Sequence, residues 1–261
     1  MNRRAWAGTL GAAAALLLGG CASMPSDPAA RAEFRANHDP LEPMNRQVFR
    51  FNFFLDRALI KPVAKGYVRI VPPKGRTALR HFLDNLTEPI VFGNDVLQGR
   101  IGAAGTTAVR FMLNSTIGLA GFRDVAAESS LPRQTGDFGQ TLWRWGWRNG
   151  GPYLIIPVLG PTNPRDGIGI GVDTYLDPVR YVEHSRWDGT IILASRSALD
   201  GIDRRAEALD ALDVIQRQSV DFYAAFRSYF RQNRAAELNG GRASPSQLPP
   251  PSFYDDPGAG K

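Results

Sequence analysis

The chain contains very little cysteine, histidine and lysine. Its 261 residues include one cysteine, three histidines and four lysines, and the other 27 basic side chains are arginines. A single cysteine cannot form a disulfide within the chain, and it excludes a zinc cluster built from several cysteines. The histidines, His38, His81 and His184, lie far apart in the sequence. We therefore expect no bound metal.

A strong excess of one charge is lacking as well. The formal net charge is +6, and the arginines are scattered along the chain. No recognised nucleic-acid-binding module is present, so we expect no nucleic-acid partner. Hydrophobic residues make up 43% of the chain, which is close to the share found in folded domains, so a core is expected.

Catalytic signatures and long apolar runs are missing too. The sequence has no Gly-x-Ser-x-Gly, His-Glu-x-x-His or phosphate-loop motif. The run Gly167–Gly171 resembles a dinucleotide fingerprint but continues into Val172, and we interpret it as a closely packed helix. After residue 20, no segment reaches the roughly 18 apolar residues of a membrane-spanning helix. We expect neither an enzyme nor a cofactor.

The first residues have the pattern of a secretion signal. Two arginines precede the apolar run 5–18, and two glycines lead directly to Cys21. The run is too short to span a membrane and suits a signal peptide over residues 1–20. The sequence Leu-Gly-Gly-Cys resembles the bacterial lipobox, which predicts that Cys21 is lipidated after cleavage. Ala22 follows the cysteine where lipoproteins retained in the inner membrane typically have Asp, so the outer membrane is expected.

Composition divides the mature chain into three parts. Residues 21–38 are small and polar and predict a lipidated tether. Residues 39–238 carry helical apolar spacing and predict one mainly α-helical domain. Residues 239–261 are rich in proline and glycine and predict a disordered tail.

Proline and apolar spacing predict where the helices begin and end. Pro43 suits a first helical turn, and the aromatic-rich stretch that follows it predicts a helix over 46–59. We expect breaks at Pro62 and at Pro72-Pro73, and a break at Thr87-Glu88-Pro89 between helices over 78–86 and 90–97. Further helices are predicted over 103–113 and 202–229, the latter interrupted near Ser219.

One segment has the pattern of strands instead. Trp143, Trp145 and Trp147 alternate with other residues, an Asn149-Gly150 pair follows, and an apolar run leads to Ile156. Alternation beside an Asn-Gly turn predicts a short hairpin-like loop over 143–156. Packing of the three rings within the core is the alternative.

Three stretches resemble the MlaA/VacJ family of bacterial outer-membrane lipoproteins. The first runs from Asp-Pro-Leu-Glu to Phe-Asn (39–52), the second is 114–126, and the third runs from Asp-Phe-Gly-Gln-Thr-Leu to Arg-Asp (137–166). Their motif residues are Asp39, Pro40, Asn45, Arg46, Asn52, Gly121, Phe122, Asp124, Gly139, Leu142, Gly151, Pro152, Tyr153, Gly160, Pro161, Arg165 and Asp166.

The resemblance implies a fold and a function. The fold is a ring-shaped assembly of amphipathic helices around a polar channel, held by its lipid on the periplasmic side of the outer membrane. The function is removal of mislocalised phospholipids from the outer leaflet and their transfer to a soluble periplasmic carrier protein, in association with a trimeric porin. The alternatives are a structural, porin-associated lipoprotein without transport activity and a periplasm-facing hydrolase.

This chain departs from the family pattern at one place. Members usually have a glycine directly after the position of Leu142, and a glycine-rich run before Gly-Pro-Tyr, whereas tryptophans occupy part of this stretch here. The resemblance and the remaining glycines together suggest a candidate gate loop that consists of Trp143, Trp145, Gly146, Trp147 and Gly150.

Overall fold

A computed structural model describes residues 39–181 and 186–240, and the residues from Pro40 onward belong to one compact unit. The predicted signal peptide, Cys21, the tether over 21–38 and the tail beyond Gly240 lie outside the described residues. Residues 239 and 240, which we assigned to the tail, are the last residues of a helix. Within the described ranges no helix combines the length and the apolar character needed to cross a membrane.

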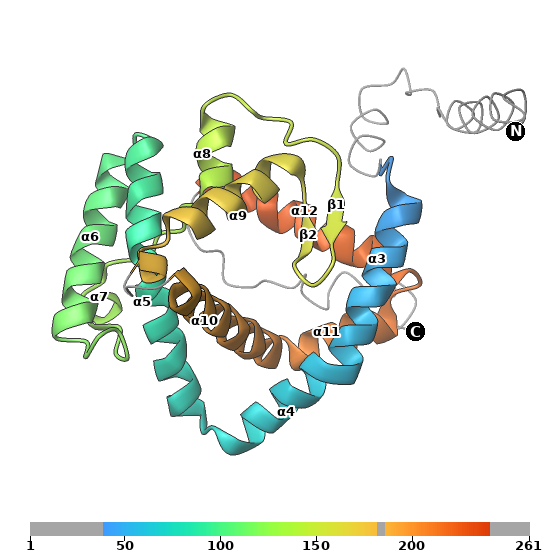
Figure 1. Cartoon of the computed structure of the whole chain (residues 1–261), viewed down its shortest axis with the longest axis horizontal. Helices are drawn as coiled ribbons and strands as arrows, with labels where there is room; N and C mark the ends of the chain where they lie inside the picture. The colour runs from blue at the N-terminus through green and yellow to red at the C-terminus, as the bar shows by residue number, and fades with distance from the viewer. Residues whose placement is uncertain (1–38, 182–185, 241–261) are drawn as a thin grey trace, which may run out of the picture. The chain divides into compact units, whose positions relative to one another are not determined.

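The described chain is mainly α-helical, as predicted, with a single pair of strands among these residues (Figure 1). The elements, in chain order, are α3 (Glu42–Leu55), the π-helix η1 (Asp56–Ile60), α4 (Lys61–Ile70), α5 (Pro73–Leu97), α6 (Ile101–Thr116), α7 (Val125–Glu128), α8 (Phe138–Arg144), β1 (Leu154–Ile156), β2 (Gly160–Thr162), α9 (Pro164–Leu176), the 3-10 helix η2 (Pro178–Tyr181), α10 (Arg186–Glu207), α11 (Leu209–Gln218) and α12 (Phe222–Gly240).

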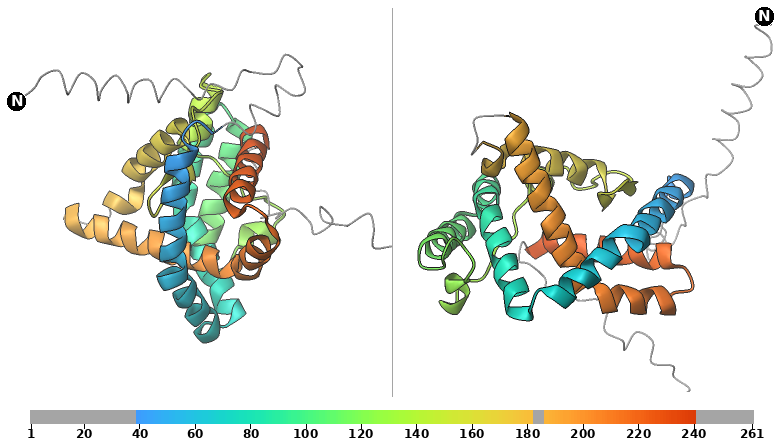
Figure 2. Two further views of the ribbon diagram at one scale, coloured as in Figure 1. Left: turned by 90° about the vertical axis from the view of Figure 1, so that its right-hand side faces the viewer. Right: turned by 60° about the horizontal axis from the view of Figure 1, so that its bottom comes forward.

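Within this unit the helices follow one another in a circuit rather than a parallel bundle. In Figure 1, α3, α4 and α5 form one side of the circuit and α8, α9 and α12 the other. Helix α6 packs antiparallel to α5, and α10 runs from η2 back across α5 and α4 (Figures 1 and 2). This arrangement agrees with the ring-shaped assembly of helices expected from the resemblance.

The first helical segment continues through Pro62, where we predicted a break. Helix α3 ends at Leu55, and η1 leads directly into α4, whose first turn contains Pro62. Pro62 directly follows the change from π-helix to α-helix, where the Lys61 N–H bonds the Asp56 carbonyl five residues back. The predicted break at Pro72-Pro73 is confirmed, since the backbone becomes extended at Val71 and α5 starts at Pro73.

Helix α5 also runs without interruption through Pro89, so the two helices predicted on either side of it are one. An interior proline removes a backbone hydrogen bond and costs about 3 kcal/mol. The helix continues nevertheless where α5 packs along α6, and the neighbouring Glu88 is buried there and accepts a hydrogen bond from Arg110 of α6. Tertiary contacts therefore override the local signal of the proline.

The hairpin lies later in the chain than we predicted, and the tryptophans are not in a strand. Trp143 is in α8, because Asp137 caps that helix by accepting a hydrogen bond from the Gln140 N–H at 2.8 Å. The strands are β1 and β2, which pair antiparallel with Ile155 opposite Pro161. The run that leads to Ile156 is thus a strand, but it is the first strand of the hairpin and not the second.

The hydrophobic core is small and aromatic. Tyr153 and Ile155 of the hairpin are buried against Tyr223 of α12, and Phe49 of α3 packs beside them. The ring centroids of Phe49 and Tyr223 lie 5.5 Å apart in an edge-to-face arrangement, a geometry that aromatic pairs prefer. This cluster holds the hairpin between α3 and α12.

Candidate functional site

The polarity of the described body is inverted relative to a typical water-soluble domain. Among the described residues, eighteen polar or charged residues are buried, compared with nine apolar ones. Thirty large apolar residues of the described chain are exposed. The exposed residues occur on the hairpin and on the long helices other than α12, and include Ile70 at 81% and Leu119 at 74% exposure. Large exposed apolar surface marks contact with a partner or a membrane. The interior is correspondingly polar.

Two asparagines of α3 bind the backbone of the hairpin. Asn45 is completely buried; its amide donates to the Tyr153 carbonyl at 2.9 Å and its oxygen accepts from the Ile155 N–H at 3.0 Å. Two helical turns further on, Asn52 repeats the pattern with the Ile156 carbonyl and the Val158 N–H, at 3.0 and 2.8 Å. Helical spacing puts both amides on one face, so α3 takes the place of a further strand beside β1.

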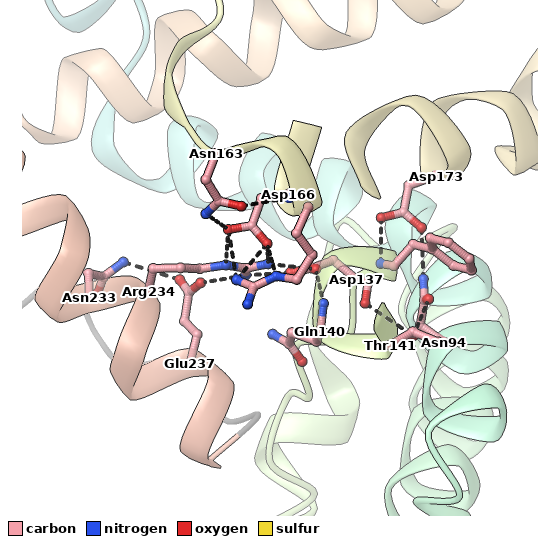
Figure 3. A network of polar contacts seen from close by, with 12 residues as sticks. Asn94, Asp137, Gln140, Thr141, Asn163, Asp166, Asp173, Asn233, Arg234 and Glu237 are labelled. Atoms are coloured by element: carbon pink, nitrogen blue, oxygen red, sulfur yellow. Dashed lines mark hydrogen bonds and ion pairs between the residues drawn. The ribbon is translucent and has the colours of Figure 1, made fainter. Parts of the chain in front are cut away.

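A second network joins α8, α9 and α12 around Arg234 (Figure 3). Its guanidinium donates to both oxygens of Asp137, at 2.6 and 2.8 Å, and to both oxygens of Asp166, at 2.8 and 3.1 Å. Arg165, which is buried, approaches Asp166 from its other side at 2.9 Å. Bidentate pairs of this kind fix orientation as well as distance. Arg234 thereby ties the last helix to the start of α8 and α9.

The carboxylates of this network ionise differently. Burial favours the neutral form of Asp166, but hydrogen bonds from Arg234 and the charges of Arg234 and Arg165 overcome burial and lower its pKa. Among the described residues, the donors to Asp173, at one end of the network in Figure 3, are the Phe138 N–H and the Asn94 amide, at 2.9 and 2.8 Å. Burial therefore prevails and raises the pKa of Asp173 to about 6.

Two glycines allow α8 and α9 to approach this closely. A Cβ on Gly139 would lie 2.5 Å from Asp166 Oδ1, and a Cβ on Gly169 would lie 2.5 Å from the Gly139 nitrogen. Real Cβ atoms do not make such contacts, so any side chain would separate the helices. The prediction that the 167–171 glycines serve close helix packing is confirmed at Gly169.

A third network joins α5, α6 and α7. Arg110 is only 2% exposed and donates to Glu88 at 3.3 Å, to Asp124 at 2.9 Å and to the Leu131 carbonyl at 2.6 Å. Burial raises the pKa of Glu88, whereas Arg110 and Asn114 hold the pKa of Asp124 low against its own burial. Asp124 also caps α7 by accepting from the Ala127 N–H at 3.0 Å.

The loop between α6 and α7 wraps tightly around Asn85. Gly121 has φ +99°, and a Cβ there would lie 2.4 Å from the Asn85 Cβ, so only glycine fits. The Asn85 amide donates to the Ala120 carbonyl at 3.3 Å, and Ala120 itself has φ +60°. Phe122 then stacks on Phe82 of α5 at 4.7 Å.

A polar cavity of about 190 Å³ lies between α5, α9 and α10. Four carboxylates line it, from Asp84, Asp173, Asp177 and Asp200, with the guanidinium groups of Arg196 and Arg204. Arg196 pairs with Asp177 at 2.6 Å, and Arg204 pairs with Asp200 at 2.7 Å. Asp84 pairs with Arg133 at 3.0 Å, so among the described residues Asp173 is the lining carboxylate without an ion pair. A lining of largely paired charges suits a polar group in an otherwise lipid-like environment.

A family model described as MlaA lipoprotein matches residues 37–237. The chain belongs to the MlaA lipoprotein family. It is 35% identical to the intermembrane phospholipid transport system lipoprotein MlaA of Escherichia coli K12 over 237 residues, which cover 89% of each chain. It is 32% identical to the Haemophilus influenzae protein of the same name, over 87% of this chain and 88% of the other.

The fold agrees with this membership in the MlaA family. A solved structure from work on the structural basis for maintenance of bacterial outer membrane lipid asymmetry matches with a TM-score of 0.68 and 32% identity. The match covers 77% of this chain and the whole of the other. A Rickettsia felis protein without a described function is also related, at 33% identity over 77% of this chain.

The structure brings most of the family-motif residues into the three networks. Asn45, Asn52 and Tyr153 meet at the hairpin, where Gly160 begins β2 with φ +88°. Arg46 pairs with Asp221 through both of its terminal nitrogens and so joins α3 to α12. Gly121, Phe122 and Asp124 form a separate group at α6 and α7, and Asp39 and Pro40 precede α3.

The candidate gate residues do not form one face. Trp143 is half-buried in α8 beneath the Arg148 guanidinium at 4.0 Å, whereas Trp145 is 60% exposed and donates to the Leu97 carbonyl at 3.1 Å. Gly146 and Gly150 have φ of +117° and +71° in the connection that follows α8. The stretch 145–153 is an irregular loop anchored at α5, and its role remains a prediction.

Sequence reasoning missed Arg234, Asp173 and the buried pair of Arg110 and Glu88. A lone arginine within the apolar helical spacing of 103–113 was the available signal for Arg110, because an unpaired charge on a buried face requires a partner. Arg234 lies in a polar stretch where nothing in the local pattern distinguishes it.

Proposed function

We propose that this protein removes mislocalised phospholipids from the outer leaflet of the outer membrane and passes them to a periplasmic carrier. Lipid asymmetry is then maintained by transfer between membranes. The proposal rests on two findings. One is membership in the MlaA family, and the other, which carries the proposal, is the inverted polarity of the body. No covalent bond of the lipid changes in this process, so the protein is a transporter and not an enzyme.

The exposed apolar residues support a body set into a lipid surface. Met112, Ile117 and Leu119 lie along the exposed side of α6 and the loop after it, and each is more than half exposed. Each fully buried side chain of this size gains about 1.5–3 kcal/mol on leaving water. Thirty such residues would be costly in water but favourable against acyl chains. The exposed apolar side chains thus attach the body to the lipid surface, without a membrane-spanning helix among the described residues.

The polar cavity between α5, α9 and α10 supplies the path for the headgroup. A charged headgroup crossing hydrocarbon loses its hydration, which is costly unless polar groups replace the water. Asp84, Asp173 and Arg196 provide such groups, while acyl chains remain against the apolar exterior. The loop 145–153 would gate this path, with Trp145 as its contact to α5.

Anchoring and partners complete the proposal. Acylation of Cys21 at the start of the mature chain, after removal of residues 1–20, would hold the protein at the periplasmic side of the outer membrane, because two or more acyl chains anchor stably. The exposed apolar surface that does not meet lipid would contact a trimeric porin. The tether over 21–38 and the tail beyond Gly240 would remain outside the folded domain.

Native mass spectrometry of the detergent-extracted, full-length protein tests this proposal. We expect bound phospholipid, a co-purifying porin and the mass of an acylated chain that starts at Cys21. A porin complex that never carries phospholipid would favour the structural alternative. Hydrolysed lipid produced by the purified protein would contradict the assignment as a transporter.

A further inference from the structure

A second pocket lies apart from the polar cavity, between α3, the hairpin, α11 and α12. Its volume is about 180 Å³, and its inner wall is apolar. That wall consists of four phenylalanines and three aliphatic residues: Phe49, Phe53, Phe222, Phe226, Ile155, Val158 and Leu212. A dry apolar cavity of about 150 Å³ accepts benzene, so this pocket has room for part of an acyl chain.

The rim of the pocket is charged, with cations in excess. Arg57, Lys61 and Arg205 border it together with two carboxylates, Asp56 and Asp213. Lys61 pairs with Asp213 at 2.6 Å, and Arg205 pairs with Asp56 at 2.7 and 3.0 Å. The charges cancel within each of these two pairs, so the positive charge of Arg57 is in excess. One surplus positive charge matches one phosphodiester.

Both arginines retain unused donors. The Arg205 side chain is 11% exposed, and its buried Nη1 has no hydrogen-bond partner within the described chain. Arg57 has no carboxylate partner among the described residues, and its guanidinium lies 5.8 Å from the Phe53 ring centroid. Buried polar atoms are nearly always hydrogen-bonded, so the Arg205 Nη1 beside this pocket is available to an acceptor on a bound ligand.

The backbone is unusual on two sides of this pocket. The π-helix η1, a rare element that occurs frequently at functional sites, carries Asp56 and Arg57 to the rim. Across the pocket, Val158 has φ +68°, which is strained for a β-branched residue, and Asn52 holds it there by accepting its N–H at 2.8 Å. Two costly conformations beside one pocket suggest that its shape is required.

We infer that this pocket binds one acyl chain of a phospholipid and that Arg57 and Arg205 hold the lipid's phosphate at the rim. This inference rests on the proposed function and adds a binding position outside the polar cavity. The aromatic wall takes the chain, and Arg205 Nη1 and the Arg57 guanidinium donate to the phosphate oxygens. A lipid seated here has its headgroup and one tail on separate surfaces.

Photo-crosslinking of the full-length protein in detergent tests the inference. The probe is phosphatidylglycerol with a diazirine in one acyl chain, and mass spectrometry locates the adducts. We expect adducts on peptides from α3, α11 and α12. Arg57→Ala should reduce this labelling about tenfold, because a charge-assisted hydrogen bond is lost. Leu212→Trp should fill the pocket and block labelling.

Arg50→Ala is the matched control, since Arg50 lies seven residues before Arg57 on α3, is exposed and does not line the pocket. It should label like the unchanged protein. Circular dichroism confirms that each variant is folded. Adducts confined to α5, α9 and α10 would overturn this inference and leave the proposed function intact. Absence of adducts anywhere would contradict both, and displacement by palmitate but not by unlabelled phosphatidylglycerol would overturn the phospholipid assignment.

Discussion

Arg110 provides the most direct test of the polar interior at the scale of single residues. Arg110→Ala leaves Glu88 and Asp124 without their shared cation, and breaking a buried pair in this way costs about 3–5 kcal/mol. Thermal unfolding of the variant should show this loss. Arg123→Ala removes an exposed pair with Glu128 and should change stability little. Equal effects of the two substitutions would contradict a structural polar interior.

Asp173 gives the stability a predicted pH dependence. Its pKa of about 6 in the folded protein is above the roughly 3.9 of an unfolded aspartate, so the folded state binds the proton more tightly. The contribution of Asp173 to the free energy of unfolding is therefore fully present below about pH 4 and is lost as the pH rises to about 6. The stability of the unchanged protein minus that of Asp173→Asn should fall over this window, measured by unfolding at several pH values. A difference that is constant or rises would contradict it.

Residues whose partners lie nearby in sequence could be predicted, and those with distant partners could not. The capping of α7 by Asp124 and the place of Pro43 in the first turn of α3 follow from local rules. Arg234 and Asp137 are 97 positions apart, and nothing in either local pattern indicates their contact. The identities of the family-motif residues were readable, whereas the three networks they form required the fold.

At the scale of elements, the packing of α8 on α9 depends on Gly169. Gly169→Ala would place a methyl group 2.5 Å from the Gly139 nitrogen and should destabilise the protein by about 1–3 kcal/mol. Gly171→Ala, two residues along the same helix, has open space and should stabilise it by about 0.5–1 kcal/mol. Opposite signs in chemical unfolding would support the close approach, and a loss of stability in both would contradict it.

The loop that follows α8 should respond to restraint. Cysteines at positions 145 and 97, where Trp145 now donates to the Leu97 carbonyl, can be joined by a short bismaleimide. If the loop 145–153 is a gate, joining them should reduce phospholipid removal while leaving thermal stability unchanged or higher. The same double-cysteine protein without the reagent is the control. Unchanged lipid removal after complete cross-linking would exclude gating and leave a packing role.

Elements with strong periodicity were predictable, and elements set by tertiary contact were not. The helical character of 202–229 and its interruption at Ser219 follow from apolar spacing, whereas the break at Ala208 between α10 and α11 does not. The continuity of α5 through Pro89 depends on α6, and the position of the hairpin depends on two asparagines about 100 residues earlier in the chain. The period-two tryptophans were misread because the helix cap at Asp137 determines the conformation of this segment.

At the scale of the whole molecule, the inverted polarity and the family relationship point to one role. Networks around Arg110 and Arg234 give the body a polar interior, and its apolar side chains face outward. Such a body is stable where lipid covers its outside and a headgroup can enter its inside. The aromatic pocket at α3 adds a place where a single acyl chain can rest.

Surface exposure of phosphatidylethanolamine tests the central claim most directly. The gene is deleted in its own bacterium and then restored, and a membrane-impermeant amine-reactive reagent labels the phosphatidylethanolamine of the outer leaflet. We predict that deletion raises this labelling several-fold, that it sensitises the cells to detergent with EDTA, and that restoration reverses both. Unchanged labelling in the deletion strain would contradict the claim that this protein removes phospholipids from the outer leaflet.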